Sequence, residues 1–291
     1  MNVLILSRNR FLYSTRRLVT ACEKQGHSVV VTDPSVCTLG LGANPELRVD
    51  GESIASFDLV VARLGLNTLD AGDRVLRFLE DRSVPSINSC SAIERAHDKF
   101  GVMLALNKAE VSAPQSLLVR NPEDLRWAVE SLGGAPLIAK TLKGNQGFGV
   151  MLLESLRSLV SVCDTFFARD EALILQEFID EAQGSDTRAF VIGDEVVAAV
   201  ERRSRAGDFR ANMHQGAELI EAKLSPEMTS IALEAARALN LQVAGVDILQ
   251  GADGFVVVDV NASPGFEGVE EATGIDIATR IVEFGQSLAK S

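Results

Sequence analysis

Two neighbouring stretches near the end of the chain decide how the rest of it is interpreted. They are Gly245-Val246-Asp247-Ile248-Leu249 and Phe255-Val256-Val257-Val258-Asp259-Val260-Asn261-Ala262-Ser263-Pro264-Gly265. Both are apolar and rich in β-branched residues, and a short glycine-flanked break separates them, which predicts two strands joined by a tight turn. Because side chains alternate between the faces of a strand, Asp259 and Asn261 should share one face. Hairpin pairing can bring Asp247 close to both.

These three polar residues offer hard oxygen ligands within an apolar hairpin. A solvated strand face with a turn-forming Asn is the alternative interpretation. The apolar flanks instead favour semi-buried acids, which need a partner. Carboxylate and amide oxygens suit Mg²⁺ or Mn²⁺, so the sequence predicts a divalent-metal site at Asp247, Asp259 and Asn261.

The composition indicates a soluble globular protein of two or three packed subdomains. The chain has 291 residues, of which 46% are hydrophobic and 23% charged. Apolar runs are only strand-sized, and Val3–Leu6 is interpreted as a first strand and not as a signal peptide, so we expect a cytoplasmic protein without a membrane span. The 4 Cys are widely spaced and there are only 3 His, which predicts free thiols and no zinc site. The net charge of −12 argues against direct nucleic-acid binding.

Residues 2–94 alternate strand and helix patterns, which predicts a small parallel sheet built from βαβ units. The predicted strands are Val3–Leu6, Val29–Thr32, Leu59–Ala62 and Val84–Asn88, and the predicted helices are Ser14–Gln25 and Leu69–Arg82. No Gly-x-Gly-x-x-Gly follows the first strand, so a dinucleotide site is not expected there. Arg8, Arg16, Arg17 and Arg63 lie near strand-to-helix junctions, where open sheets bind ligands; ordinary surface charge is the alternative.

A second mixed unit contains a Gly-rich loop between two strands. Its predicted elements are the helices Ser91–Asn107 and Pro122–Leu132 and the strands Ser116–Val119, Leu137–Lys140 and Val150–Leu153. The loop Lys143-Gly144-Asn145-Gln146-Gly147-Phe148-Gly149 returns into a strand, unlike Walker and Rossmann loops, which open a helix. A glycine flap whose N–H groups approach phosphates fits, with a flexible β-turn as the alternative. Lys140, at the end of an apolar strand, needs an anionic partner and favours the flap.

The third unit combines strands with the densest positive cluster of the chain. Its other predicted elements are the strands Leu173–Phe178, Thr187–Ile192 and Glu195–Glu201 and the helices Ser225–Asn240 and Asp276–Ala289. Arg202, Arg203, Arg205 and Arg210 follow the third strand closely. Because the planar fork of arginine binds carboxylates and phosphates bidentately, we expect a clamp for phosphate and substrate carboxylates. A solvated basic loop is the alternative.

Several motifs carry a family resemblance that covers essentially the whole chain. They are Leu6-Ser7-Arg8 with Tyr13-Ser14, Ala62-Arg63-Leu64-Gly65, Asp98-Lys99, Lys140 with its Gly-rich flap, Gln176-Glu177-Phe178, Gly207-Asp208-Phe209-Arg210-Ala211-Asn212 and Asp259-Val260-Asn261-Ala262-Ser263-Pro264-Gly265. With these motifs the chain resembles the ATP-grasp superfamily, and within it the RimK group of ATP-dependent glutamate ligases.

The resemblance implies an ATP-grasp fold of α/β and α+β parts. These are an N-terminal βαβ (pre-ATP-grasp) domain over residues 1–94, a central lobe with the Gly-rich flap over residues 95–179, and a C-terminal lobe with the metal site over residues 180–291. The resemblance also implies roles for single residues. Lys99 and Lys140 would contact the phosphates, Glu177 and Phe178 would bind the adenine, and Asp186 would bind the ribose. Arg210, Ala211 and Asn212 would line the phosphate end, with Arg210 catalytic, and Asp247, Asp259 and Asn261 would hold two metal ions.

Two positions depart from the family pattern. The family usually has Glu where this chain has Asp259, which moves the carboxylate back by about 1.5 Å, one carbon–carbon bond. Well-known members have Arg-Gly-Gly where this chain has Gln215-Gly216-Ala217. The second departure bears on acceptor choice and not on the ATP chemistry.

The resemblance also implies the reaction and its partners. ATP would phosphorylate a carboxylate, and the amine of an incoming amino acid would displace phosphate to form an amide. We expect L-glutamate to be added to the acidic C-terminal tail of ribosomal protein S6, by a homo-oligomer. The alternatives are the same chemistry on a coenzyme, a small peptide or an amino-group carrier protein, or a non-catalytic ATP-sensing regulator.

Overall fold

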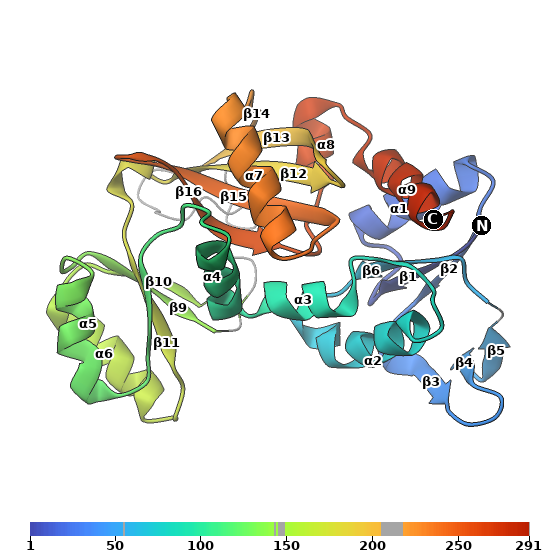
Figure 1. Ribbon diagram of the computed structural model, residues 1–291, viewed down its shortest axis with the longest axis horizontal. Helices are drawn as coiled ribbons and strands as arrows, with labels where there is room; N and C mark the ends of the chain where they lie inside the picture. Colours follow the sequence, from blue (N-terminus) through green and yellow to red (C-terminus); the bar gives the residue numbers. More distant parts are fainter. Residues whose placement is uncertain (55, 143, 145–148, 205–217, 291) are drawn as a thin grey trace.

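The computed structural model describes residues 1–54, 56–142, 144, 149–204 and 218–290. Figure 1 shows three parts along the longest axis: an N-terminal part at one end, a central part at the other, and a C-terminal sheet between them. The described residues form four β-sheets. This arrangement of mixed helices and sheets agrees with the predicted fold class.

The N-terminal sheet is parallel, as the βαβ pattern predicts, with the strand order β2-β1-β6-β7. Its elements are β1 (Asn2–Ser7), α1 (Tyr13–Lys24), β2 (Ser28–Thr32), β6 (Leu59–Arg63), η2 (Leu66–Thr68), α2 (Leu69–Glu80) and β7 (Ser86–Ile87). After β2 come a 3-10 helix, η1 (Pro34–Val36), and a small antiparallel sheet that the sequence did not predict. The strands of this sheet are β3 (Cys37–Gly40), β4 (Glu46–Val49) and β5 (Glu52–Ile54).

The C-terminal helix α9 (Ile277–Leu288) packs on this N-terminal sheet and lies beside α1 (Figure 1). Gly285 shows how close the packing is, because a Cβ added there would lie 2.4 Å from the Leu59 side chain. Asp276 caps the helix by accepting from the Thr279 N–H. The two ends of the chain therefore build one structural unit.

The single helix predicted over Ser91–Asn107 is two helices in the structure, α3 (Cys90–His97) and α4 (Lys99–Lys108). Asp98 breaks it, because its backbone is extended and its carboxylate accepts from the Phe100 N–H as the N-cap of α4. The break places Lys99 at the first position of a new helix. Lys99 thereby comes to line the central cavity of the molecule.

The central lobe is an antiparallel sheet of order β10-β9-β11-β8 with two helices on one face (Figure 1). Its elements are β8 (Ser116–Val119), η3 (Pro122–Asp124), α5 (Leu125–Ser131), β9 (Leu137–Thr141), β10 (Val150–Leu153), α6 (Leu156–Phe167) and β11 (Leu173–Glu177). Leu137 and Ala139 are fully buried in the cluster beneath the helices. Alternation along β9 then turns Ile138 and Lys140 to the opposite, open face.

The C-terminal sheet is antiparallel, with the order β14-β13-β12-β15-β16. Its elements are η4 (Asp180–Ala182), β12 (Ser185–Ile192), β13 (Glu195–Arg203), β14 (Glu218–Glu221), α7 (Pro226–Ala238), β15 (Val243–Gly251), β16 (Gly254–Asn261) and α8 (Glu267–Thr273). The predicted pairing of the two apolar stretches is confirmed, because β15 and β16 form an antiparallel hairpin.

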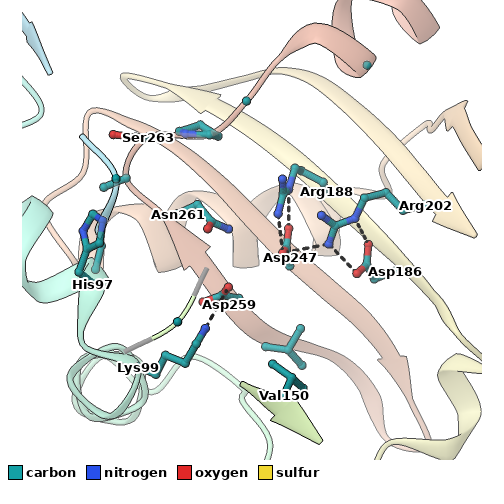
Figure 2. Close-up of a pocket in the computed structure, with 18 of the residues that line it drawn as sticks. His97, Lys99, Val150, Asp186, Arg188, Arg202, Asp247, Asp259, Asn261 and Ser263 are labelled. Carbon is teal, nitrogen blue, oxygen red and sulfur yellow. Dashed lines mark hydrogen bonds and ion pairs between the residues drawn. The ribbon is translucent and has the colours of Figure 1, made fainter. Parts of the chain in front are cut away.

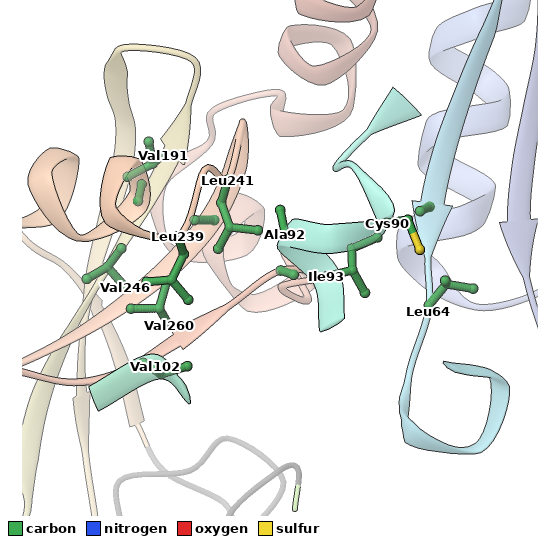
Figure 3. Close-up of a cluster of buried hydrophobic side chains, with 14 of the residues drawn as sticks. Leu64, Cys90, Ala92, Ile93, Val102, Val191, Leu239, Leu241, Val246 and Val260 are labelled. Carbon is green, nitrogen blue, oxygen red and sulfur yellow. The ribbon is translucent and has the colours of Figure 1, made fainter. Parts of the chain in front are cut away.

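Buried contacts join the N-terminal part to the C-terminal sheet. Figure 3 shows Ala92 and Ile93 of α3 between Cys90 and Leu64 on one side and Leu241 on the other. Asn88, 1% exposed, adds polar links: its amide donates to the carbonyls of Val243 (2.7 Å) and Ala262 (2.8 Å). Its carbonyl accepts from the N–H groups of Gln242 (2.7 Å) and Val243 (2.9 Å).

The structure also bears on the cysteines and on the length of the helices. All four cysteines are free. In the described part of the chain, no helix has the length and apolarity needed to cross a bilayer.

Candidate active site

A cavity of about 580 Å³ lies where the three parts of the molecule meet. Its walls come from the strand ends of the N-terminal sheet, the open face of the central sheet and one face of the C-terminal hairpin. Figure 2 shows the hairpin side of this cavity. The sequence-predicted residues within the described chain that line it are Lys99, Lys140, Glu177, Phe178, Asp186, Asp247, Asp259 and Asn261.

The hairpin register brings the predicted metal ligands onto one wall. Asp247 pairs directly with Asp259, and Gly245 with Asn261. The register then shifts, so that Ile248 pairs with Val257 and Val258 is an extra residue on β16. Such a bulge re-aims neighbouring groups. Here the Val258 carbonyl accepts from Lys140 Nζ across the gap between lobes, at 3.2 Å.

Two lysines from different elements reach the same wall. Lys99 Nζ lies 3.6 Å from Asp259 Oδ2, a loose ion pair (Figure 2). Lys140 forms no ion pair with a carboxylate of the described residues. Burial, together with the charge of Lys99, lowers the pKa of Lys140 to about 8. A buried cation without a paired anion is costly, so this end of the cavity is suited to a strongly anionic group.

Glu177 and Phe178 lie at the end of β11, where it leaves the central sheet. Both line the cavity. One oxygen of Glu177 is already used, because Oε1 accepts from the Gln115 N–H at 2.8 Å. That bond, with the Glu177 N–H donating to the Gln115 carbonyl at 3.1 Å, fixes the strand end in place. The second carboxylate oxygen of Glu177 and the backbone of Phe178 could form hydrogen bonds to a ligand in the cavity.

A cross-strand ion network that the sequence did not predict lies beside the metal-ligand wall (Figure 2). Arg188 holds Asp247 bidentately, with both distances 2.7 Å. Arg202 holds Asp186 at 2.5 and 2.6 Å and also reaches Asp247 at 2.9 Å. Burial raises the pKa of Asp247, but the two arginines outweigh it and bring that pKa down to about 2. Asp247 is therefore an ionised group whose charge is already balanced.

The strand registers create this network, since Asp186 faces Arg202 and Arg188 faces Asp247. The predicted strand began at Thr187 and left Asp186 outside it, whereas β12 begins at Ser185. The charged residues Asp186 and Arg188 are two positions apart and share one face of β12, and this spacing could have indicated that the strand begins before Thr187. The pairing of Arg188 with a residue 59 positions away had no local signal.

The donor set partly fits a divalent cation. The Asp259 side chain is 32% exposed: its Oδ1 accepts from the Val260 N–H at 3.1 Å, and its Oδ2 has only the distant Lys99 contact. Asn261 keeps its carbonyl oxygen for the cavity because its amide donates weakly to the Gly245 carbonyl at 3.5 Å. Carboxylate and amide oxygens are the ligands that Mg²⁺ prefers. Asp247 accepts three hydrogen bonds from arginines, which leaves about one of the roughly four acceptor positions of a carboxylate for a metal.

Of the two members of the expected arginine clamp that the structure describes, Arg202 lines the cavity and Arg203 does not. Arg202 is 3% exposed, and its Nε and Nη2 pair with Asp186 and Asp247. Arg203 is on the outer face and pairs with Glu201 at 2.8 Å. Alternation along β13 explains the split between a buried and an exposed arginine. The remaining predicted residues, Arg205, Arg210, Ala211 and Asn212, and the flap positions 143 and 145–148, lie outside the described residues.

The four N-terminal arginines have different surroundings. Arg8 and Arg63 line the cavity. Arg17 instead joins α1 to the C-terminal helices, through Glu270 at 2.8 Å and Asp276 at 2.9 Å. Arg16 is exposed and does not line the cavity, in keeping with ordinary surface charge. Two of the four arginines at the strand-to-helix junctions therefore line the cavity.

One other group of possible metal ligands occurs among the described residues: Asp73, Cys90 and Glu94, whose ligand atoms lie within 4.8 Å of one another. Arg77 already pairs with Asp73 at 3.0 Å and Glu94 at 2.7 Å. Burial raises the pKa of the Cys90 thiol to about 12, so it is protonated at neutral pH and a poor ligand. These contacts describe a structural cluster that joins α2 to α3.

Comparison with known proteins agrees with this geometry. Residues 1–93 match the RimK PreATP-grasp domain and residues 96–284 match the RimK-like ATP-grasp domain. The chain is 41% identical to "Probable alpha-L-glutamate ligase 1" of Shewanella frigidimarina, covering 100% of this chain and 97% of that protein. It is 42% identical, with the same coverage, to "Probable alpha-L-glutamate ligase" of Vibrio cholerae.

Solved structures share the fold. The ATP-grasp ligase PsnB in complex with its minimal precursor superposes with a TM-score of 0.78 at 24% identity, over 99% of this chain and 98% of that one. A RimK domain ATP-grasp protein of Sphaerobacter thermophilus gives 0.76 at 20% identity, over 98% and 99%. The fold is thus the ATP-grasp fold with an N-terminal pre-ATP-grasp domain, and with both family domains matched in order along it, the chain belongs to the RimK-like ATP-grasp ligase family.

Proposed function

We propose that this protein is an ATP-dependent carboxylate–amine ligase that adds L-glutamate to the C-terminus of ribosomal protein S6. One observation carries the proposal: Lys99 of α4, Lys140 of β9, and Asp259 and Asn261 of β16 converge on one cavity. The full-length relatives named as alpha-L-glutamate ligases support the choice of amino acid. The acceptor follows only from the family resemblance.

The cavity divides into a nucleotide end and a reaction end. At the nucleotide end, Glu177 and Phe178 are proposed to hold the adenine, and Asp186 the ribose hydroxyls. Asp186 already pairs with Arg202, so its remaining acceptor capacity would serve the ribose. Lys140 and Lys99 are proposed to contact the phosphates, with Arg210, Ala211 and Asn212 completing that end.

Asp259 and Asn261, with the one remaining acceptor position of Asp247, would hold Mg²⁺ or Mn²⁺, in a site for two ions. A bound divalent cation neutralises phosphate charge and thereby eases phosphoryl transfer. The shorter Asp259 is compatible with this role because its carboxylate faces the cavity.

The chemistry needs positioning and charge more than covalent help from the protein. A carboxylate is a poor electrophile, so the γ-phosphoryl group of ATP is first transferred to it, which gives an acyl phosphate and ADP. The amine of glutamate then attacks the acyl carbon, and inorganic phosphate leaves with the C–O electron pair. Lys140 and Lys99 are proposed to hold the phosphoryl oxygens, and Arg210 is proposed to stabilise the developing charge. No enzyme nucleophile is required.

Two further expectations stand as parts of this proposal. The domain boundaries 1–94, 95–179 and 180–291 are proposed because each range contains its own main sheet. A homo-oligomer is proposed as well, and light scattering on the purified protein measures its mass directly.

Mass spectrometry tests the proposed function. The protein is incubated with ATP, Mg²⁺, L-glutamate and each candidate acceptor: the S6 tail, a small acidic peptide, a coenzyme carboxylate and an amino-group carrier protein. The proposal predicts a glutamyl mass increment on the S6 tail, with one ADP per amide. Glutamylation of another acceptor would overturn the S6 assignment alone, and ATP consumption without any amide product would overturn the ligase.

A further inference from the structure

Arg63 is the feature of the cavity that the proposed nucleotide and metal roles leave unused. It ends β6 of the N-terminal sheet and lies at the edge of the cavity that faces away from the central lobe. None of the carboxylates in the described ranges forms an ion pair with it, whereas Arg17, Arg188 and Arg202 each have at least one such partner. Burial lowers the pKa of Arg63 to about 10, so it remains a cation at neutral pH.

The protein fixes the orientation of this guanidinium without neutralising it. Nη2 donates to the Pro264 carbonyl at 2.7 Å, and the guanidinium carbon lies 5.7 Å from the centre of the Phe266 ring. Phe266 is fully buried and packs edge-to-face on Tyr13 and Phe190, with ring centres 6.3 and 6.2 Å away. A guanidinium has five N–H donors, so most of them remain for a ligand after the bond to Pro264.

The surroundings of Arg63 suit an anion that is smaller and less charged than a triphosphate. Arg8 adds a second positive charge to the cavity lining contributed by the N-terminal part, and the polar side chains of Ser14 and Asn67 belong to the same lining. Glu267 is the acidic residue of the described lining there. The end therefore carries a net positive charge in a chain whose total is −12.

Little chain separates the Arg63 contact from the strand that carries Asp259 and Asn261. Pro264, the partner of Arg63, follows Asn261 by three residues, which span at most about 11 Å of chain. Ser263 Oγ donates to the Ala62 carbonyl at 3.3 Å, so the connection between the metal strand and β6 is short and fixed. Arg63 is thus tied to the short segment that directly follows the proposed metal ligands.

We propose that Arg63 forms a carboxylate-binding subsite for one of the two ligation substrates, through the free edge of its guanidinium fork. This inference rests on the proposed ligase function and adds a specificity residue to it. A carboxylate binds such a fork bidentately, which a hydroxyl or an amide cannot reproduce. The carboxylate belongs either to the incoming glutamate or to the acidic end of the acceptor, and the experiment distinguishes the two.

The test compares KM values of three variants for ATP, glutamate and acceptor. Arg63→Gln keeps a donor for the Pro264 carbonyl and loses the charge, while Arg63→Lys keeps the charge and loses the fork. Arg17→Gln is the matched control, because Arg17 also ties the N-terminal part to the C-terminal segment but does not line the cavity. We expect Arg63→Gln to raise one substrate KM by about tenfold to a hundredfold, as for a lost charge-assisted hydrogen bond. The KM for ATP should stay within about twofold of the wild-type value.

A double-mutant cycle against the substrate identifies the carboxylate. Each carboxylate of glutamate, and the side-chain carboxylate of the terminal residue of the acceptor, is replaced in turn by an amide. If Arg63 contacts that carboxylate, the amide and Arg63→Gln will together cost little more than either alone. Non-additivity with a glutamate amide assigns the subsite to the amino acid, and with an acceptor amide to the acceptor. Either result supports the subsite.

Three outcomes would count against the inference. Unchanged substrate KM values in folded Arg63→Gln and Arg63→Lys overturn it while the ligase stands. Equal rises in all three KM values, matched by Arg17→Gln with a similar loss in Tm, would show a structural role only. Wild-type protein that forms no amide with any pair overturns the proposed function and the subsite with it. Arg63→Lys keeps the test valid should Arg63→Gln fail to fold.

Discussion

At the scale of single residues, Lys140 is the most informative group for nucleotide binding. It is buried, bonded only to the Val258 carbonyl among the described residues, and its pKa is lowered to about 8. A lysine must be protonated to bind phosphate. Its depressed pKa therefore makes phosphate affinity depend on pH just above neutrality.

We predict that ATP affinity is constant below pH 7 and falls as the pH rises through about 8, by up to tenfold per pH unit, because protonating the lysine then opposes binding. Isothermal titration calorimetry of the wild type from pH 6.5 to 9.5 measures this. Lys140→Arg, which stays charged, should remove the slope, and Lys140→Ala should weaken ATP binding at every pH. A wild-type affinity independent of pH would exclude Lys140 from the phosphate site.

Asp259 is one of the two positions at which the sequence is expected to depart from the family pattern, and it lines the cavity. We predict that Asp259→Asn abolishes ADP release at any attainable Mg²⁺ concentration, since the site loses a charge that balances the cation. Asp259→Glu should retain activity, because Glu is the usual family residue. The measurement is ADP release against Mg²⁺ concentration, and normal turnover by the Asn variant would place the metal elsewhere.

At the scale of elements, the pairing of β12, β13 and β15 concentrates two arginines and two aspartates at one point. We predict that Arg202→Gln lowers the free energy of unfolding by about 3–5 kcal/mol, because it leaves the carboxylate of Asp186 without its arginine partner and Asp247 with Arg188 alone. The neighbouring Arg203→Gln is the control and should cost at most about 1 kcal/mol, since its pair with Glu201 is exposed. Urea unfolding compares them. Equal losses would contradict the assignment of buried and exposed faces.

The elements also show what the sequence could and could not predict. Strongly apolar runs such as Val150–Leu153 gave strands with correct bounds, because alternation and turn residues are local signals. The sheet over residues 37–54 was missed because its strands are short and interrupted by polar turns. The break at Asp98 was missed because its capping bond competes with helix continuation. Helices α6 and α8 were not predicted at all.

The candidate site was predictable only as far as local patterns reach. Spacing along β16 placed Asp259 and Asn261 on one face, and the register confirms their alignment with Asp247. The partners of Asp247 come from β12 and β13, and sequence spacing carries no trace of that pairing. For the same reason Arg202 was expected to be free, although it is buried.

At the scale of the whole molecule, Asn88 couples the N-terminal part to the segment that follows β16. We predict that Asn88→Ala lowers the free energy of unfolding by about 3 kcal/mol or more. The substitution leaves the backbone groups that Asn88 binds without a partner, and each buried group left unsatisfied costs about 1–3 kcal/mol. The exposed Asn107→Ala should change the free energy of unfolding by less than about 0.5 kcal/mol. Urea denaturation measures both. An unaffected Asn88→Ala protein would show that these links do not hold the parts together.

The central claim concerns the whole molecule as a ligase that activates a carboxylate with ATP. It is tested most directly by labelling both oxygens of the acceptor carboxylate with ¹⁸O and measuring the inorganic phosphate released by mass spectrometry. If the carboxylate is phosphorylated and the amine of glutamate then displaces phosphate, one labelled oxygen must leave with the phosphate for each amide formed. We predict phosphate with a single ¹⁸O, in proportion to the product. Unlabelled phosphate alongside amide formation would contradict the account.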